Sequence, residues 1–225
     1  MCKKVVVFDL DDTLYKEIDF LKSAYREIAD WFRDQYGIYG LWSEMLRYYR
    51  EKKDVFQEVI DFYKRPVNKE FLIKMYREHD PSILLDDDTK QVLDILKTKN
   101  YGLGIITDGR MVSQMNKIKA LGLDTYFTEE DIVISEVWEH EKIDGFGYAL
   151  MEKLFPNGGF IYVGDNPKKD FLAANKRGWT TICLLDDGRN IHQQDFNLPK
   201  EYLPQYKVKK IGEVVEIVGS TSDRL

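Results

Sequence analysis

The length, composition and charge of the chain indicate one large domain, or one domain that carries an insertion. The chain has 225 residues, of which 44% are hydrophobic and 32% charged, and its formal net charge is −6. This mildly acidic balance gives no overall attraction to nucleic acid or to an anionic membrane. The two cysteines are too few for a disulfide framework or a thiolate metal site.

The sequence also lacks the patterns of secreted and membrane-spanning proteins. Residues 1–10 do not have the long apolar region and cleavage site of a signal peptide. No apolar run approaches the roughly 20 residues that cross a bilayer. We therefore expect a cytoplasmic monomer or homodimer with neither nucleic acid nor a membrane as partner.

Short apolar runs alternate with amphipathic segments along most of the chain. Strands are predicted at residues 4–10, 101–107, 159–164 and 180–185, each of them brief and rich in β-branched residues. Helices are predicted at residues 89–99, 112–121, 148–155 and 168–176. This alternation predicts an α/β fold, with a doubly wound, mostly parallel, Rossmann-like sheet.

Residues 15–80 interrupt the alternation with helical patterns alone. Helices are predicted at residues 17–36, 41–63 and 68–79. A strand–helix–strand unit needs a single crossover helix, so we interpret this stretch as a helical subdomain inserted after the first strand. The predicted core therefore comprises residues 1–14 and 81–218, and residues 219–225 are predicted to form a flexible tail.

Three carboxylates lie within four residues at the end of the first strand: Asp9, Asp11 and Asp12. Their mutual repulsion requires compensation, and crowded oxygen ligands suit Mg²⁺. In extended geometry Asp9 and Asp11 project to the same side. One of them could act as a nucleophile and the other, with a raised pKa, as a general acid and base. The alternative is an acidic loop that caps the following helix.

The second strand ends in Thr107, which is followed by Asp108 and Gly109. A hydroxyl followed by backbone N–H groups at a turn can bind a phosphate group. A simple helix cap with a turn glycine is the alternative. Ligands of parallel sheets bind beyond the carboxyl ends of the strands, which favours the phosphate interpretation.

The third strand ends at Gly164, and Asp165, Asn166 and Asp170 follow it. Asp165 leaves the same edge of the sheet as Asp9, so the two carboxylates can share a metal ion. Asp170 is predicted in the first turn of a helix, where it either orients the site or interacts with the helix dipole.

An isolated lysine, Lys142, lies between two of the site-forming strands. Most lysines in charged stretches are solvated, but the position of this one favours a role in the site. Lys168 and Lys169 are the alternatives for that role.

Together these residues resemble the motifs of the haloacid dehalogenase superfamily. The first motif corresponds to Asp9, Asp11 and Thr13, the second to Thr107, the third to Lys142 and the fourth to Gly164, Asp165 and Asp170. The insertion at residues 15–80 resembles the helical cap of the subgroup whose cap follows the first motif. The sequence departs from many members at Ile143, where those members have proline after the lysine.

The resemblance implies a Mg²⁺-dependent phosphatase that forms an aspartyl-phosphate intermediate. Asp9 would be the nucleophile, and Asp11 would protonate the leaving alcohol and then activate water. The metal would be held by Asp9, Asp165 and the carbonyl group of Asp11. The phosphate would be bound by Thr107, Asp108, Gly109 and Lys142, with support from Thr13, Asn166 and Asp170. A closed chamber beneath a cap suits a small phosphorylated metabolite, with a sugar or polyol phosphate favoured.

Three other functions are alternatives to a phosphatase: a dehalogenase, a mutase and a non-catalytic binding module. Dehalogenases of the superfamily lack the second aspartate, so Asp11 argues against carbon–halogen chemistry. A phosphosugar mutase shares every motif, and a product assay with hexose 1-phosphates would separate it from a phosphatase. A non-catalytic module that binds a phosphorylated ligand would retain unused, mutually repelling carboxylates.

Overall fold

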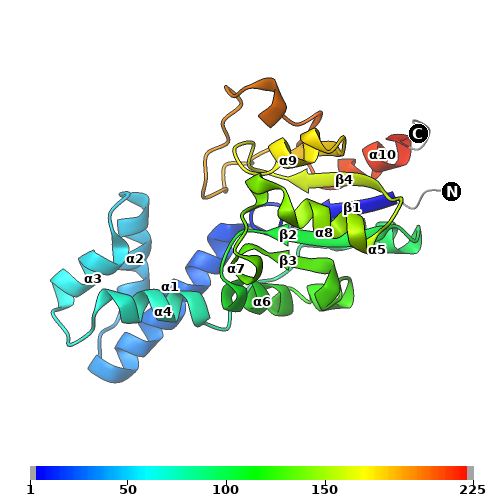
Figure 1. The fold of residues 1–225 in the computed structure, drawn as a ribbon. Helices are drawn as coiled ribbons and strands as arrows, with labels where there is room; N and C mark the ends of the chain where they lie inside the picture. Colours follow the sequence, from blue (N-terminus) through cyan, green and yellow to red (C-terminus); the bar gives the residue numbers. More distant parts are fainter. Residues whose placement is uncertain (1–3, 222–225) are drawn as a thin grey trace.

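A computed structural model describes residues 4–221 as a parallel sheet covered by helices, with four further helices to one side (Figure 1). The strand order is β3-β2-β1-β4-β5-β6, and all neighbouring strands are parallel. The strands are β1 (Lys4–Phe8), β2 (Gly102–Thr107), β3 (Ile132–Ile134), β4 (Gly159–Gly164), β5 (Thr180–Leu184) and β6 (Tyr206–Val208). The predicted doubly wound α/β fold is confirmed.

Alternate side chains of the central strand β1 pack into two separate cores. Val6 and Phe8 belong to one cluster, whereas Val5 and Val7 belong to the cluster on the opposite face. Successive residues of a strand point to opposite faces, so a strand buried on both sides has an uninterrupted apolar sequence. This explains why the run of valines was recognisable as an interior strand.

Helices cover both faces of the sheet. They are α5 (Asp87–Thr98), α6 (Met111–Ala120), α7 (Ser135–Trp138), α8 (Phe146–Leu154), α9 (Phe171–Lys176) and α10 (Glu213–Ser220). Leu93 of α5, Ile118 of α6 and Val214 of α10 join the cluster of Phe8. Tyr148 of α8 and Phe171 of α9 lie in the opposite cluster. The faces are therefore covered by α5, α6 and α10 on one side and by α8 and α9 on the other.

The stretch between β1 and α5 forms a helical bundle with a core of its own. Its helices are α1 (Glu17–Tyr36), α2 (Leu41–Arg50), α3 (Val55–Tyr63) and α4 (Lys69–Glu78). Ile28, Phe32, Met45 and Leu72 pack together in its interior. In Figure 1 this bundle lies beyond the carboxyl ends of the strands, beside the edge where the predicted site residues gather. None of the helices in the described part of the chain is long and apolar enough to cross a membrane.

The single helix predicted at residues 41–63 is wrong, because two helices occupy that stretch. Lys52 adopts a left-handed backbone conformation with φ of 56°, which ends the first helix. The carboxylate of Asp54 then accepts a hydrogen bond from the backbone N–H of Gln57 and caps the second. An aspartate directly before a potential helix start is a recognisable capping signal, so the sequence carries the information for two helices here.

Element ends also differ from prediction in the last third of the chain. The helix predicted from residue 168 begins at Phe171, because the N–H groups of Lys169 and Asp170 donate to the Asn166 carbonyl in a preceding turn. Helix α10 extends to Ser220, two residues into the predicted tail, and the Ser220 hydroxyl donates to the Ile217 carbonyl. Residues 222–225 of that tail lie outside the described part.

Candidate active site

Three adjacent strands bring the predicted site residues to one edge of the sheet. Asp9 follows β1, Thr107 ends β2 and Asp165 follows β4, and β1 pairs with both of the other strands. The Asp9 N–H donates to the Val163 carbonyl at 2.8 Å, so the β1–β4 ladder continues into the site. The site therefore lies beyond the carboxyl ends of the strands, as is usual in parallel sheets.

Asp9, Asp165 and Asp170 form a buried carboxylate cluster at this edge. One oxygen atom of each lies within 4.8 Å of the others. The three residues are 5%, 4% and 0% exposed, so water cannot screen their repulsion. Clustered carboxylate oxygens are the ligands that hard divalent cations such as Mg²⁺ prefer. The donor set fits such a cation.

The ammonium group of Lys142 lies inside this cluster. Its Nζ is 2.8 Å from Oδ1 of Asp9 and 2.7 Å from Oδ1 of Asp170. Burial opposes the charged form of Lys142, but the charges of Asp170 and Asp9 outweigh it and hold the pKa well above its ordinary value. The alternatives Lys168 and Lys169 are exposed on the surface. The third-motif lysine is thus placed against the proposed nucleophile despite the departure at Ile143.

The electrostatics of the cluster favour the binding of a cation. Burial, opposed by Lys142, raises the pKa of Asp9 to about 7. Burial and the neighbouring charges of Asp170 and Asp9 raise the pKa of Asp165 to about 9. A bound divalent cation would favour the ionised form of both groups, so metal binding should release protons.

Asp170 acts as an anchor for the loop that follows β4. Its Oδ2 accepts hydrogen bonds from the N–H groups of Asp165, at 3.1 Å, and Asn166, at 2.7 Å. A Cβ atom added to Gly164 would lie 2.6 Å from that same oxygen. Only glycine therefore allows the carboxylate to approach the loop. The prediction that Asp170 lies in the first turn of a helix is wrong, because α9 begins at Phe171 and Asp170 directly precedes it.

Asp11 lies in a different electrostatic environment from Asp9. Lys117 Nζ is 2.8 Å from its Oδ1, Gln114 Nε2 is 2.9 Å from its Oδ2, and the Tyr15 hydroxyl donates to Oδ1. Burial alone would raise the pKa of Asp11, but Lys117 and these hydrogen bonds together lower it below its ordinary value. The raised pKa predicted for the acid–base aspartate is therefore wrong for Asp11. None of these three partners was predicted from the sequence. Gln114 and Lys117 lie on α6, and the amphipathic pattern of a helix does not show which loop its buried polar residues meet.

The predicted phosphate-binding turn is only partly available for a ligand. The Thr107 hydroxyl, 1% exposed, accepts a hydrogen bond from Gln114 Nε2 at 2.6 Å. Gly109 is exposed, but its N–H already donates to Ser135 Oγ at 2.9 Å. Among these backbone groups, the N–H of Asp108 is left as the one to bind phosphate. The Asp108 side chain has a different role, since its Oδ1 accepts from the N–H of Lys142 at 2.9 Å.

The loop after β1 is tied together by Asp12 and not by Thr13. The Asp12 carboxylate accepts hydrogen bonds from the N–H groups of Glu17 and Ile191, each at 3.0 Å. Thr13 Oγ1 is buried and has no hydrogen-bond partner among the described residues. The expected supporting role of the Thr13 side chain is therefore not seen. A carboxylate can accept from two amides at once, which explains why Asp12 performs this task.

A loop that follows β5 contacts the carboxylate cluster through two side-chain amides, and nothing in the sequence indicated this contact. Asn190 Nδ2 donates to Asp165 Oδ2 at 2.8 Å, and Gln194 Nε2 donates to the Asp165 carbonyl at 2.7 Å. Asn190 also accepts a hydrogen bond from Lys16, 2.7 Å away, just before α1. The loop therefore connects the metal-site candidate to the start of the helical bundle.

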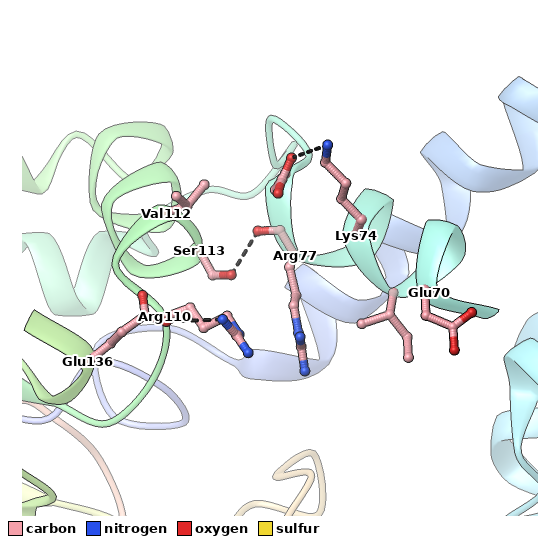
Figure 2. A pocket seen from close by; sticks show the side chains of 9 residues that line it. Glu70, Lys74, Arg77, Arg110, Val112, Ser113 and Glu136 are labelled. Carbon is pink, nitrogen blue, oxygen red and sulfur yellow. Dashed lines mark hydrogen bonds and ion pairs between the residues drawn. The ribbon is translucent and has the colours of Figure 1, made fainter. Parts of the chain in front are cut away.

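A hollow of about 330 Å³ lies next to the site, between α4 of the bundle and α6 and α7 of the core. Its lining residues include Arg77, Arg110 and Glu136 but none of the clustered aspartates. Figure 2 shows Arg77 and Arg110 on its two sides, one from the bundle and one from the core. The Ser113 hydroxyl donates to the Arg77 carbonyl at 2.7 Å across the junction. The hollow thus marks where bundle and core meet beside Gly109.

Comparison with known proteins identifies the family. The model of the haloacid dehalogenase-like hydrolases matches residues 6–184, so the chain belongs to this family. A Methanocaldococcus jannaschii protein named glyceraldehyde 3-phosphate phosphatase is 28% identical over 236 residues, which cover 96% of each chain. A protein of the same name from Methanothermobacter thermautotrophicus is 29% identical, covering 80% of this chain and 85% of that one.

A solved structure shows the same fold. The HAD-hydrolase YfnB from Bacillus subtilis, bound to magnesium, superposes with a TM-score of 0.68 at 20% identity, over 97% of this chain and 99% of that one. The predicted family and the predicted hydrolase class are confirmed.

The raised pKa of Asp165 predicts a stability that falls as the pH rises in the metal-free protein. The folded protein keeps a proton on Asp165 up to about pH 9, whereas the unfolded chain loses it near pH 4. Folding is therefore progressively opposed between these values. Melting temperatures measured in EDTA from pH 5 to pH 8 should fall less for Asp165→Asn than for the wild type.

Added Mg²⁺ should counteract this fall in the melting temperature of the wild type. The rise in melting temperature on adding Mg²⁺ should be larger at pH 8 than at pH 6 and should be lost in Asp165→Asn. An equal rise at both pH values, or in both proteins, would contradict a metal site at Asp165.

Gly164→Ala should disconnect the loop after β4 from its anchor. The new methyl group displaces the Asp170 carboxylate from the amides of Asp165 and Asn166, and buried amides without partners cost about 1–3 kcal/mol each. We expect a clear loss of stability in urea titration together with weaker Mg²⁺ binding. Gly212→Ala meets no atom within 4 Å and serves as the control. Unchanged Mg²⁺ affinity in Gly164→Ala would show that Asp170 does not set the geometry of the site.

Proposed function

We propose that this protein is a Mg²⁺-dependent phosphatase that hydrolyses a small phosphorylated metabolite of the phosphosugar or polyol phosphate class. The observation that supports this most strongly is the placement of two carboxylates, Asp9 and Asp11, beside separate buried lysines at the edge of the sheet. The names of the archaeal relatives support the substrate class and make glyceraldehyde 3-phosphate the first substrate to test.

In the proposed reaction Asp9 is the nucleophile. An oxygen of its carboxylate attacks phosphorus, and the bond from phosphorus to the ester oxygen breaks, so that an aspartyl-phosphate forms and an alcohol leaves. The ammonium of Lys142, 2.8 Å from Asp9, offsets the negative charge that phosphate brings. Thr107 and the N–H of Asp108 bind the phosphoryl oxygens. Such transfers depend mainly on positioning and charge stabilisation.

Asp11 carries the protons in both halves of the reaction. In the first half Asp11 must carry a proton, which its pairing with Lys117 opposes in the free protein, and it gives that proton to the leaving alkoxide. In the second half the ionised Asp11 removes a proton from the attacking water. The released groups are the alcohol and inorganic phosphate. A second carboxylate near the nucleophile distinguishes this phosphate chemistry from that of dehalogenases.

The aspartates are proposed to hold a magnesium ion. Its ligands would be the side chains of Asp9 and Asp165 and the carbonyl group of Asp11, with Asp170 fixing the loop behind them. When bound, the ion would supply positive charge that screens the carboxylates from one another and from the phosphate. The buried, acidic donor set supports this choice over a softer metal.

The helical bundle α1–α4 is proposed to be a cap that covers the site. It is joined to the core at both of its ends, after Tyr15 and near His79, where Asn116 Nδ2 donates to the His79 carbonyl at 3.0 Å. A lid anchored in this way can exclude water and enclose a small ester. A bulky protein substrate would have to hold the lid open.

Asp9→Asn should abolish hydrolysis and leave the fold intact, because the amide keeps the shape of the side chain and is no nucleophile. We expect turnover to fall by about 10³ or more, and a melting temperature no lower than that of the wild type. The control is Asp124→Asn, an exposed aspartate remote from the cluster, which should behave as the wild type does. Activity of Asp9→Asn above about 1% of wild type would remove Asp9 from the role of nucleophile.

The substrate class is tested by comparing kcat/KM for glyceraldehyde 3-phosphate, hexose phosphates, glycerol phosphates and a phosphopeptide, all with Mg²⁺. We expect the small esters to be preferred by at least tenfold, which is about 1.4 kcal/mol of transition-state binding. A tenfold preference for the phosphopeptide would contradict the enclosed site. Conversion of a hexose 1-phosphate to the 6-phosphate without release of phosphate would identify a mutase instead.

A further inference from the structure

The side chain of Asp11 is fixed by donors from outside the four motifs. Both of its oxygen atoms face Lys117 Nζ, at 2.8 Å and 3.0 Å. Gln114 Nε2 donates to Oδ2 and the Tyr15 hydroxyl donates to Oδ1. Two of these donors, Gln114 and Lys117, lie on the same face of α6, three residues apart. The direction of the carboxylate is thus set by one helix of the core.

Asp11 is the one carboxylate in the described part of the chain within ion-pair distance of Lys117, and Glu17 interacts with Lys117 over a longer distance. Lys117 is 4% exposed, and its only ion pair there is with Asp11. Its ammonium lies 4.4 Å from the centre of the Phe20 ring, on α1. A buried ammonium is costly unless it is paired and hydrogen-bonded. The pair therefore constrains both partners: Lys117 cannot turn to water, and Asp11 cannot swing freely.

Gln114 connects Asp11 to the phosphate-binding turn. Its side-chain nitrogen, 2.9 Å from Asp11, also lies 2.6 Å from Thr107 Oγ1 and 3.2 Å from the Asp108 carbonyl. Gln114 is 1% exposed. One buried amide therefore fixes the distance between the proton-carrying carboxylate and the groups that bind the phosphoryl oxygens.

We propose that Lys117, assisted by Gln114, is a positioning residue for Asp11. The inference rests on the proposed phosphatase reaction and adds to it the groups that aim the proton-carrying carboxylate. The ammonium of Lys117 contacts the carboxylate of Asp11, which is not among the atoms proposed to bind the metal. It acts by holding that carboxylate where the leaving oxygen and the attacking water pass. When the Asp11 carboxylate loses this orientation, only the steps in which it transfers a proton are slowed.

That restriction gives the proposal a kinetic signature. Formation of the aspartyl-phosphate from p-nitrophenyl phosphate needs little proton donation, because nitrophenolate is a good leaving group. Formation from glyceraldehyde 3-phosphate needs a proton for the alkoxide. Breakdown of the intermediate needs a general base with either substrate. A misdirected Asp11 should spare the first of these steps and slow the other two.

The experiment is stopped-flow kinetics of Lys117→Met with both substrates, with Mg²⁺ present. With p-nitrophenyl phosphate we expect a burst of about one equivalent of nitrophenolate at a rate within threefold of wild type, followed by turnover slowed about 10²-fold. With glyceraldehyde 3-phosphate the first turnover itself should slow by a similar factor. Lys117→Arg, which keeps the charge and the donors, should restore both rates to within tenfold of wild type.

Two further variants keep the result interpretable. Lys119→Met, an exposed lysine of the same helix, should match the wild type. Gln114→Met should give the same pattern as Lys117→Met, with a smaller effect of about tenfold, and takes its place if Lys117→Met fails to fold.

The outcomes separate the two proposals. A wild-type enzyme that releases no nitrophenolate, or one whose activity survives Asp9→Asn, contradicts the proposed function. An active wild type with Lys117→Met unchanged in every phase overturns the positioning role alone. Equal slowing of the burst and of the later turnover also overturns it, because a general loss of structure would produce that result.

Discussion

The structure of this site depends on one buried cation, the ammonium of Lys142, set among carboxylates at the end of three parallel strands. A buried charge is stable only when it is paired, and Lys142 pairs with Asp9 and Asp170 at 2.8 Å and 2.7 Å. Burial raises the pKa of Asp9 and Asp165, and the neighbouring carboxylates raise it further because one ammonium does not balance three negative charges. The surplus negative charge makes a further cation favourable there.

A second buried lysine separates the tasks of two aspartates that are only two residues apart. Asp9 faces Lys142 and the carboxylate cluster, and its pKa is raised, chiefly by burial. Asp11 faces Lys117, which lowers its pKa against the effect of burial. In the free protein these shifts run opposite to the proposed roles, because a nucleophile must be ionised and a general acid must carry a proton. Helix α6 contributes to this division and also contacts the helical bundle. The same helix therefore supports the proposed cap, the proposed acid–base carboxylate and the proposed phosphate-binding turn.

The sequence was sufficient for the four longer strands of the sheet, because β1 is buried on both faces and parallel strands end at the same edge. That topology alone predicted that Asp9, Thr107 and Asp165 would meet. It did not reveal Lys117, because which face of an amphipathic helix meets a particular loop is decided by tertiary packing. The three-residue strands β3 and β6 carry too few residues for a pattern. The support expected from Thr13 came from Asp12, a choice that depends on which amides the folded loop presents.

The central claim is that Asp9 forms a covalent bond to phosphorus, and trapping that bond tests it most directly. An aspartyl-phosphate is an acyl phosphate, which borohydride reduces to the alcohol and so converts the residue to homoserine. Enzyme mixed with Mg²⁺ and glyceraldehyde 3-phosphate, quenched within the first turnovers and reduced, should yield homoserine at position 9 on peptide mass mapping. The same treatment without substrate should yield none. Homoserine at another aspartate, or at none while phosphate is being released, would contradict the account.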